Sequence, residues 1–291
     1  MDIITFLVSV FCLVDDFLKD KPLRQRGPRP TLQDSEVVTM EIVGEFLGID
    51  TDSGIFHYFR RHYGAWFPAL CRVHRTTFVR QAANLWAVKQ QLWAALIGQV
   101  DHDALISITD SLPIPVCRFG RAYRCRILAG NTAFGKDQVA RQTFLGLRVH
   151  MRLTLPGVIT DFRLAPANVQ DLEVAPDLFA GVEGWVLGDR NYWSPTLRET
   201  GQERGLFWLT PFKKVQPDKH PWPHWLSRKR YLIDTVFSQL TERFHAKRVW
   251  ARDAWHFFSR WLRKVLSHTV AIFFCQQLGL PALHFADLII D

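Results

Sequence analysis

The chain has 291 residues, of which 48% are hydrophobic and 22% are charged. This length and composition allow a large buried core, which excludes wholesale disorder and leaves room for two domains. Lys and Arg number 36 against 28 Asp and Glu, so the formal net charge is +8. A surplus of positive charge favours a polyanionic partner, most often nucleic acid.

The cysteines and the N-terminal residues indicate where the protein works. None of the five cysteines lies in a CxxC pair, and an odd number does not favour a disulfide framework or a structural zinc site. The apolar run near the N-terminus is short, has no basic leader and is followed by Asp15 and Asp16. We therefore expect a packed helix there rather than a signal peptide or membrane span, and a cytoplasmic protein.

The first 100 residues are predicted to be helical. A basic, Pro-rich stretch at 22–30 separates a first helix from a second, which covers 35–48. A third helix is predicted from about Thr76 to Ile97, where apolar residues recur near helical spacing. This region is expected to bind DNA or to mediate dimerisation.

The pattern changes to short apolar and alternating segments after residue 100, which predicts strands joined by helices. A Pro-Gly turn at 156–157 indicates a hairpin, and the remaining connections indicate crossovers, so we expect a mixed sheet flanked by helices. A Pro-rich linker is predicted at 214–227. The predicted strands cover 104–110, 144–155, 158–165, 184–189 and 205–213, and the predicted helices cover 168–181, 194–204, 228–248 and 254–279.

Two acids directly follow apolar strands, Asp110 and Asp189. An acid at the carboxyl end of a strand points into the crevice where α/β sheets hold ligands. The alternative is an Asp that caps the next helix or turn. Pro113 and Pro115 leave no helix for Asp110 to cap, whereas the turn after Asp189 is compatible with capping.

A third acid, Asp234, lies at the margin of an apolar helix face. It could point into a site, or form an ion pair with Arg230 one turn earlier. Two strand-end acids and one helix acid together form a ligand set for two divalent ions, and hard oxygen ligands suit Mg²⁺ or Mn²⁺. Two such ions can clamp a phosphodiester, one at the nucleophile and one at the leaving oxygen.

These motifs resemble, over nearly the whole chain, those of DDE-type insertion-sequence transposases with a ribonuclease H-like catalytic core. The closest resemblance is to the compact nine-eight-two group of the insertion-sequence series. The motifs, in order, are TLQDSEVVTMEIVGEFLGID, SITDSLPIPVC, a hairpin with its "AN…D" turn, VLGDRNY and RKRYLIDTVFSQLTERF. The short separation between Asp189 and Asp234 leaves no room for the large β-insertion that some relatives carry.

The resemblance implies an α/β ribonuclease H-like catalytic domain at 101–291 behind the helical region at 1–100. It implies cut-and-paste transposition, in which activated water cuts the element end and the freed 3′-hydroxyl attacks target DNA. The catalytic and metal-binding residues would be Asp110, Asp189 and Asp234, with two Mg²⁺ ions that Mn²⁺ can replace. The partners would be double-stranded DNA and a second copy of the chain, because two ends are cut in concert, and the DNA-bound protein would associate with the nucleoid.

The third acid departs from the family, which usually has Glu where this chain has Asp234. Asp234 could act as it stands, after a small backbone adjustment. Glu242 could replace it, although two helical turns displace Glu242 by about 12 Å. The copy could also be catalytically impaired. The alternatives to a transposase are therefore a DNA-binding protein derived from one, or a nuclease that cuts without joining.

Basic residues gather around the three acids, and as a set they indicate phosphate contacts, although each alone could be a solvated surface charge. The resemblance assigns Arg230 to a phosphate contact near the cut, while Ser227 stands where the family has a Tyr partner. The predicted DNA-binding basic residues are Arg118, Arg121, Arg124, Lys136, Arg190, Lys213, Lys214, Arg228, Lys229, Arg230, Arg243, Lys247 and Arg248.

Four aromatic residues near these motifs could hold an unpaired base or pack in the core: Tyr192, Trp193, Trp208 and Trp250. Trp193, close behind Asp189, is the one predicted to contact DNA.

Overall fold

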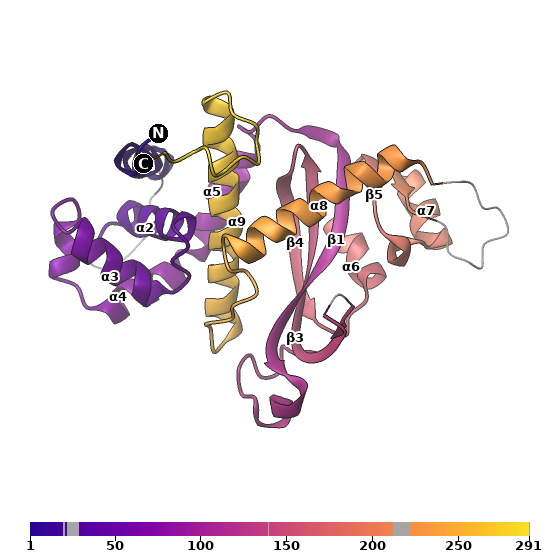
Figure 1. Ribbon diagram of the computed structural model, residues 1–291, viewed down its shortest axis with the longest axis horizontal. Helices are drawn as coiled ribbons and strands as arrows, with labels where there is room; N and C mark the ends of the chain where they lie inside the picture. The colour runs from indigo at the N-terminus through magenta and orange to yellow at the C-terminus, as the bar shows by residue number, and fades with distance from the viewer. Residues whose placement is uncertain (20, 22–28, 139, 212–221, 291) are drawn as a thin grey trace. The chain divides into compact units, whose positions relative to one another are not determined.

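The computed structural model describes residues 1–19, 21, 29–138, 140–211 and 222–290 (Figure 1). The chain forms two compact units. The helical unit contains residues 1–100 and 240–291, and the sheet unit contains residues 101–239. Residues 240–291, which we expected to belong to the catalytic domain, thus group with the N-terminal helices. The extent of a catalytic domain stays a prediction.

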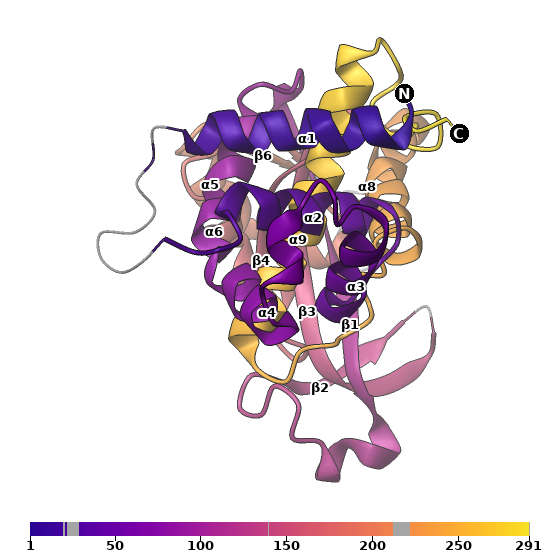
Figure 2. The same cartoon turned by 90° about the vertical axis from the view of Figure 1, so that its left-hand side faces the viewer.

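The helical unit is built around its last helix, α9 (Ala254–Gln277), which contacts α2, α4 and α5. Most of α9 is buried, including the charged Arg263 and Lys264, because α2, α4 and α5 pack against it. Figure 2 shows α9 behind α2. The helix predicted from 76 to 97 is two helices that meet at Leu85. The other helices of this unit are α1 (Ile3–Leu18), α2 (Asp34–Phe46), α3 (Asp52–His62), α4 (Arg75–Asn84), α5 (Trp86–Ile97) and the short 3₁₀ helix η1 (Pro68–Cys71).

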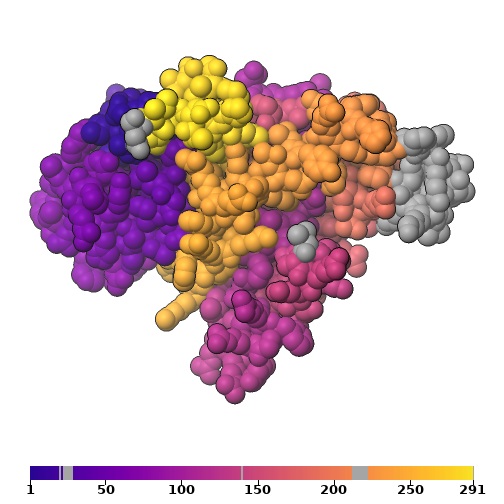
Figure 3. Space-filling view, viewed as in Figure 1, coloured from indigo at the N-terminus to yellow at the C-terminus, as the bar shows by residue number. Residues whose placement is uncertain are grey.

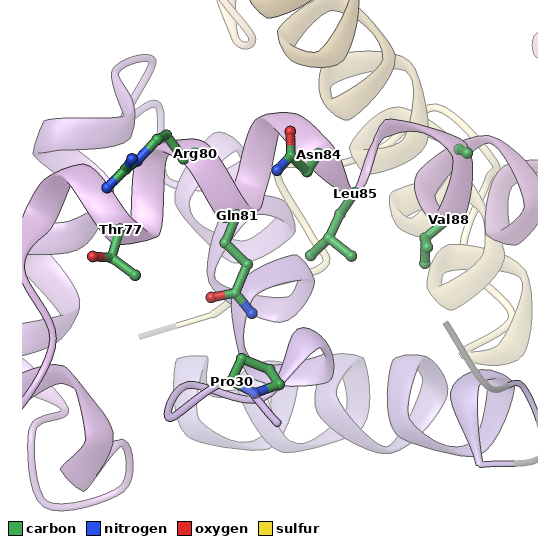
Figure 4. A pocket seen from close by; sticks show the side chains of 8 residues that line it. Pro30, Thr77, Arg80, Gln81, Asn84, Leu85 and Val88 are labelled. Atoms are coloured by element: carbon green, nitrogen blue, oxygen red, sulfur yellow. The ribbon is translucent and has the colours of Figure 1, made fainter. Parts of the chain in front are cut away.

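A side-chain amide ties α4 to the segment that leads into α2. Gln81 Nε2 donates to the carbonyl oxygen of Leu32 at 2.9 Å and to Asp34 Oδ1 at 2.7 Å. In Figure 4, Gln81 points from α4 toward the side of the pocket where Pro30 lies. Because the amide is buried, these bonds fix the entry into α2.

Buried charges connect four helices of the helical unit. Arg263 of α9 is fully buried, and its guanidinium lies 2.6 Å from Glu45, 3.3 Å from Glu41 and 2.7 Å from Asp52. Lys89 of α5 donates to both carboxylate oxygens of Glu41 at 2.9 Å. Buried charges are tolerated only when they are paired and hydrogen-bonded, so these contacts specify how α2, α3, α5 and α9 pack.

The sheet unit contains a mixed sheet, which confirms the predicted architecture. In the described part of the chain it has six strands in the order β2-β3-β1-β5-β6, with β4 also paired to β3. The pairs β1–β5 and β5–β6 are parallel, and the pairs of β3 with β1, β2 and β4 are antiparallel. The strands are β1 (Asp103–Arg118), β2 (Ala133–Asp137), β3 (Gln142–Leu155), β4 (Val158–Pro166), β5 (Gly184–Leu187) and β6 (Leu206–Leu209).

Strand β1 does not end at Asp110 as the sequence predicts, but continues to Arg118 through two prolines. Strand β5 pairs with β1 from Ile106 to Ile108, and beyond this point no strand of the described part of the chain pairs with this edge of β1. Proline is accepted at such an edge because it has no N–H to donate. Pro113 and Pro115 are two residues apart and therefore face the same edge of the strand.

Helices cover the sheet and differ from the predictions mainly at their ends. Helices α6 (Asp171–Leu178) and α7 (Pro195–Gln202) pack with β5 and β6 around a core that includes Tyr192 and Trp208. Helix α8 (His224–Glu242) begins inside the predicted linker, most of which, at 214–221, lies outside the described residues. Among the described helices, none has the combination of length and apolar character that crossing a membrane requires.

The buried charges of the helical unit yield a stability prediction. Arg263→Ala should lower the free energy of unfolding by about 3–5 kcal/mol, because it leaves Glu45, Glu41 and Asp52 buried without their shared partner. Chemical denaturation would measure this. Arg248→Ala is the control, because Arg248 is 57% exposed in its 3.3 Å ion pair with Asp50, and it should cost about 1 kcal/mol or less. Equal losses in both variants would contradict the role assigned to burial.

Candidate active site

The parallel register of β1 with β5 brings Asp110 and Asp189 together. Ile108 of β1 pairs with Leu187 of β5, and each acid lies two residues beyond its member of this pair. Side-chain direction repeats every two residues along a strand, and neighbouring strands are about 4.8 Å apart. The two carboxylates therefore lie side by side at the point where β5 ends, and the negative charge of Asp189 acts on Asp110.

The surroundings of the partly buried Asp110 carboxylate disfavour its charged form. Burial and the nearby charge of Asp189 raise its pKa to about 7. Two contacts oppose this: the Ser111 backbone N–H donates to Oδ1 at 2.7 Å, and Arg230 Nη1 lies 3.5 Å from Oδ2. One backbone N–H and one long ion pair do not offset the repulsion, so the site lacks positive charge.

Asp189 both caps a turn and faces Asp110. Burial raises its pKa, while the Asn191 backbone N–H donates to Oδ1 at 2.8 Å and opposes the rise. The Asn191 side-chain amide donates to Oδ2, also at 2.8 Å. These bonds begin the 3₁₀ helix η3 (Arg190–Tyr192). The capping role that the sequence left open thus exists, and it fixes the direction of this carboxylate.

A hydrogen bond to the buried side chain of Tyr192 connects the segment that carries Asp110 with the segment that carries Asp189. The Tyr192 side chain is fully buried, and Thr109 Oγ1 donates to its hydroxyl at 3.2 Å. Because Thr109 precedes Asp110 and Tyr192 follows Asp189, this bond couples the two segments. Trp208 stacks on Tyr192 with ring centroids 5.7 Å apart. Both rings belong to the core, so neither is available to hold a base.

Sequence reasoning missed the buried pair His150 and Asp171, which lies on the other face of β1. His150 pairs with Ser111 in the sheet register, and its Nδ1 lies 3.0 Å from Asp171 Oδ1. Burial alone would raise the pKa of Asp171, but the His150 and Ser111 side chains lower it. The charge of Asp171 then raises the pKa of Asp110 and of Asp189. Two sequence signals could have indicated the pair: the alternation of apolar and polar residues in β3, which contains His150, and the "AN…D" turn, whose acid is Asp171.

Asp234 does not join the other two acids. It lies on the exposed side of α8, and no group of three His, Cys, Asp or Glu side chains able to hold a metal occurs among the described residues. Arg230, one turn earlier on the same helix face, does reach Asp110. Asp234 lies about 6 Å further along the axis and has a much shorter side chain.

The predicted basic residues of the sheet unit are mostly exposed. Arg230 is the one that contacts an acid of the site, and its side chain is 29% exposed. Trp193, the predicted DNA-contacting aromatic residue, is half-buried. Lys213 and Lys214 lie outside the described residues. The exposed members are Arg118, Arg121, Arg124, Lys136, Arg190, Arg228 and Lys229.

Two of the three predicted basic residues after α8, Arg243 and Arg248, have partners within the helical unit. The Arg243 guanidinium lies over the Phe46 ring at 4.1 Å, and burial lowers its pKa. Arg248 pairs with Asp50, and Lys247 is half-buried. A separate basic pocket in this unit is lined by Arg75, Arg80, Arg252, Arg260 and the exposed Trp250, among others.

Asp110 and Asp189 suit a hard divalent cation. Two adjacent carboxylates whose pKa values are both raised lack positive charge, and oxygen ligands are those that Mg²⁺ and Mn²⁺ prefer. A cation between them would replace repulsion with attraction. The fold thus places two carboxylates side by side where β5 ends, with Arg230 beside Asp110.

Comparison with known proteins identifies one family. A family model described as a transposase DDE domain matches residues 100–250, which include the whole sheet and all three acids. A search of curated proteins and a search of solved structures each found no significant match.

The repulsion at Asp110 predicts pH-dependent stability. A folded-state pKa near 7, above the unfolded value of 3.8, means that ionising Asp110 costs stability as the pH rises through this range. Asp110→Asn should therefore raise the free energy of unfolding of the metal-free protein by up to about 4 kcal/mol at about pH 8, because each pKa unit corresponds to about 1.4 kcal/mol, and change it little at about pH 4. Denaturation at both pH values would measure this, with Asp177→Asn, at an exposed position of helix α6, as control. A loss of stability at the higher pH would contradict the assignment.

Proposed function

Because the chain belongs to the transposase DDE domain family, we propose that it cuts DNA at the ends of an insertion sequence and joins those ends to target DNA. Family membership, together with the mixed sheet flanked by helices, confirms the expected ribonuclease H-like fold class. The observation that carries the proposal is the juxtaposition of Asp110 and Asp189 by the parallel register of β1 and β5.

We propose Asp110, Asp189 and Asp234 as the catalytic acids and the ligands of two Mg²⁺ ions, for which Mn²⁺ can substitute. When bound, such ions supply an activated nucleophile and stabilise the leaving oxygen of a phosphodiester. Asp110 and Asp189 are fixed by the sheet and by the bonds from Ser111 and Asn191. Asp234 would need α8 to move toward the sheet.

Arg230 is proposed to contact a DNA phosphate close to the cut. Its guanidinium is partly exposed and lies beside Asp110, so it can turn from the carboxylate to a phosphate oxygen. The exposed basic residues of the sheet unit would neutralise further phosphates. The proposed partners are double-stranded element ends, target DNA and a second copy of the chain, since two ends must be cut together.

The order of the motifs further supports assignment to the nine-eight-two group. A protein that acts on chromosomal DNA would work in the cytoplasm at the nucleoid.

The position of Asp234 favours a second candidate function. An acid that is exposed and apart from the other two also fits a copy that binds DNA without cutting it. A nuclease that cuts without joining would yield cleavage products alone.

The first test is cleavage of DNA that carries the inverted repeat flanking the gene, in Mg²⁺ and in EDTA. Asp110→Ala and Asp189→Ala should each abolish cleavage and strand joining while DNA binding stays within about two-fold, because they remove ligands rather than phosphate contacts. Asp177→Ala, at an exposed position of α6, should cut normally. Strong residual cleavage in either site variant would overturn the two-metal assignment, and cleavage without joined products would identify a nuclease.

The third acid has its own test. Asp234→Glu should cut at least as fast as the parent protein, because one added methylene extends the carboxylate toward the site, whereas Asp234→Ala should lose activity. Initial rates at saturating Mg²⁺ would show this. Glu242→Gln is the matched control and should leave the rate unchanged. Loss of cleavage in Asp234→Glu, or in Glu242→Gln alone, would refute the role given to Asp234.

A further inference from the structure

The connection between β1 and β2 carries a concentrated positive charge. Residues 111–136 contain four arginines and one lysine and no acid. The arginines Arg118, Arg121, Arg124 and Arg126 are all exposed. They belong to the 3₁₀ helix η2 (Phe119–Arg124) or flank it, and we call residues 118–134 the basic tip.

Three aromatic side chains of the basic tip are exposed, although the sequence did not single them out. Tyr123 is 76% exposed, Phe119 is 62% exposed and Phe134 is 51% exposed. Phe119 and Phe134 lie together with ring centroids 5.5 Å apart, and the Arg124 guanidinium lies 5.0 Å from the centre of the Tyr123 ring. Large apolar groups gathered on a surface mark a binding site more often than isolated ones do.

The basic tip is an ordered part of the sheet unit rather than a loose loop. Ala122 and Leu128 are buried, and the Cys125 backbone N–H donates to the Ala122 carbonyl oxygen at 3.0 Å. The segment lies at the far end of β1, at the bottom of Figure 1, and its atoms form the lower point of the surface in Figure 3. Its aromatic rings are therefore presented outward on a defined support.

The chemistry of the basic tip fits nucleic acid better than protein. Arginine and aromatic residues are enriched in protein interfaces as well, but four arginines and one lysine without an acid over residues 111–136 favour a polyanionic partner. Arginines that contact the backbone, combined with aromatic rings that stack on bases, are the means by which proteins hold unpaired nucleotides. Paired bases in a duplex do not offer their faces to such rings.

We propose that the basic tip binds unpaired bases of DNA, with Tyr123 and Phe119 stacking on bases and Arg121 and Arg124 contacting phosphates. This inference rests on the proposed function, because opened DNA is what a protein that cuts element ends would hold. It gives this surface a preference for distorted over regular duplex DNA.

The test compares two DNA probes in EDTA, so that binding is measured without cleavage. One is a regular duplex, and the other is the same duplex with a short mismatched bubble that contains 2-aminopurine. The parent protein should bind the bubble at least about five-fold more tightly and quench the 2-aminopurine fluorescence. Tyr123→Ala should lose both effects and retain duplex binding, and Tyr123→Trp should retain all three. Arg121→Ala should weaken binding to both probes.

A matched control is Trp185→Ala, because Trp185 of β5 is 48% exposed and lies outside the basic tip; it should bind both probes as the parent does. Equal affinity of the parent protein for the two probes, or an unchanged preference in Tyr123→Ala, would overturn the inference while leaving the proposed function intact. A change of oligomeric state in Tyr123→Ala with unchanged probe preference would assign the surface to a second copy instead. If the parent protein binds neither probe, both the inference and the proposed function fail.

Discussion

The constraint on which the candidate site depends is the parallel pairing of β1 with β5. This pairing sets Ile108 opposite Leu187. Because side-chain direction repeats every two residues along a strand, the same register places Asp110 beside Asp189. A shift of one residue would turn one of the acids to the opposite face of the sheet. The pairing also ends there, which leaves room for two prolines in β1 and opens the edge at which the acids lie.

Buried acids of the two units differ in how much positive charge lies beside them. Burial would raise the pKa of Asp52 in the helical unit, but Arg263 and Arg260 lower it strongly. Asp110 is also partly buried, but the negative charge of Asp189 adds to the effect of burial and the 3.5 Å ion pair with Arg230 does not offset them, so its pKa is raised to about 7. Asp52, which supports packing, is thus neutralised by two arginines. Asp110 lacks such compensation at the place where a cation would bind under the proposed function.

The sequence predicted the mixed sheet, the hairpin and the two strand-associated acids because each depends on a local pattern. It did not predict that β1 continues past Asp110, since that depends on where the neighbouring strand stops. It missed the pairing of His150 with Asp171, because a buried polar pair depends on the register of β3 and on α6. It left open whether Tyr192 holds a base or packs in the core, and the burial of its side chain, with the hydrogen bond from Thr109, places it in the core.

Helix α8 carries both Arg230, which contacts Asp110, and Asp234, the proposed third acid. Ile233, Val236 and Phe237 are buried and hold the helix, while Asp234 faces solvent and Arg230 contacts Asp110. A cation at Asp110 and Asp189 would compete with Arg230 for the same carboxylate, and a DNA phosphate would give Arg230 another acceptor. Each event therefore favours the other, and this coupling is reciprocal. Binding of DNA and binding of metal are accordingly expected to strengthen each other.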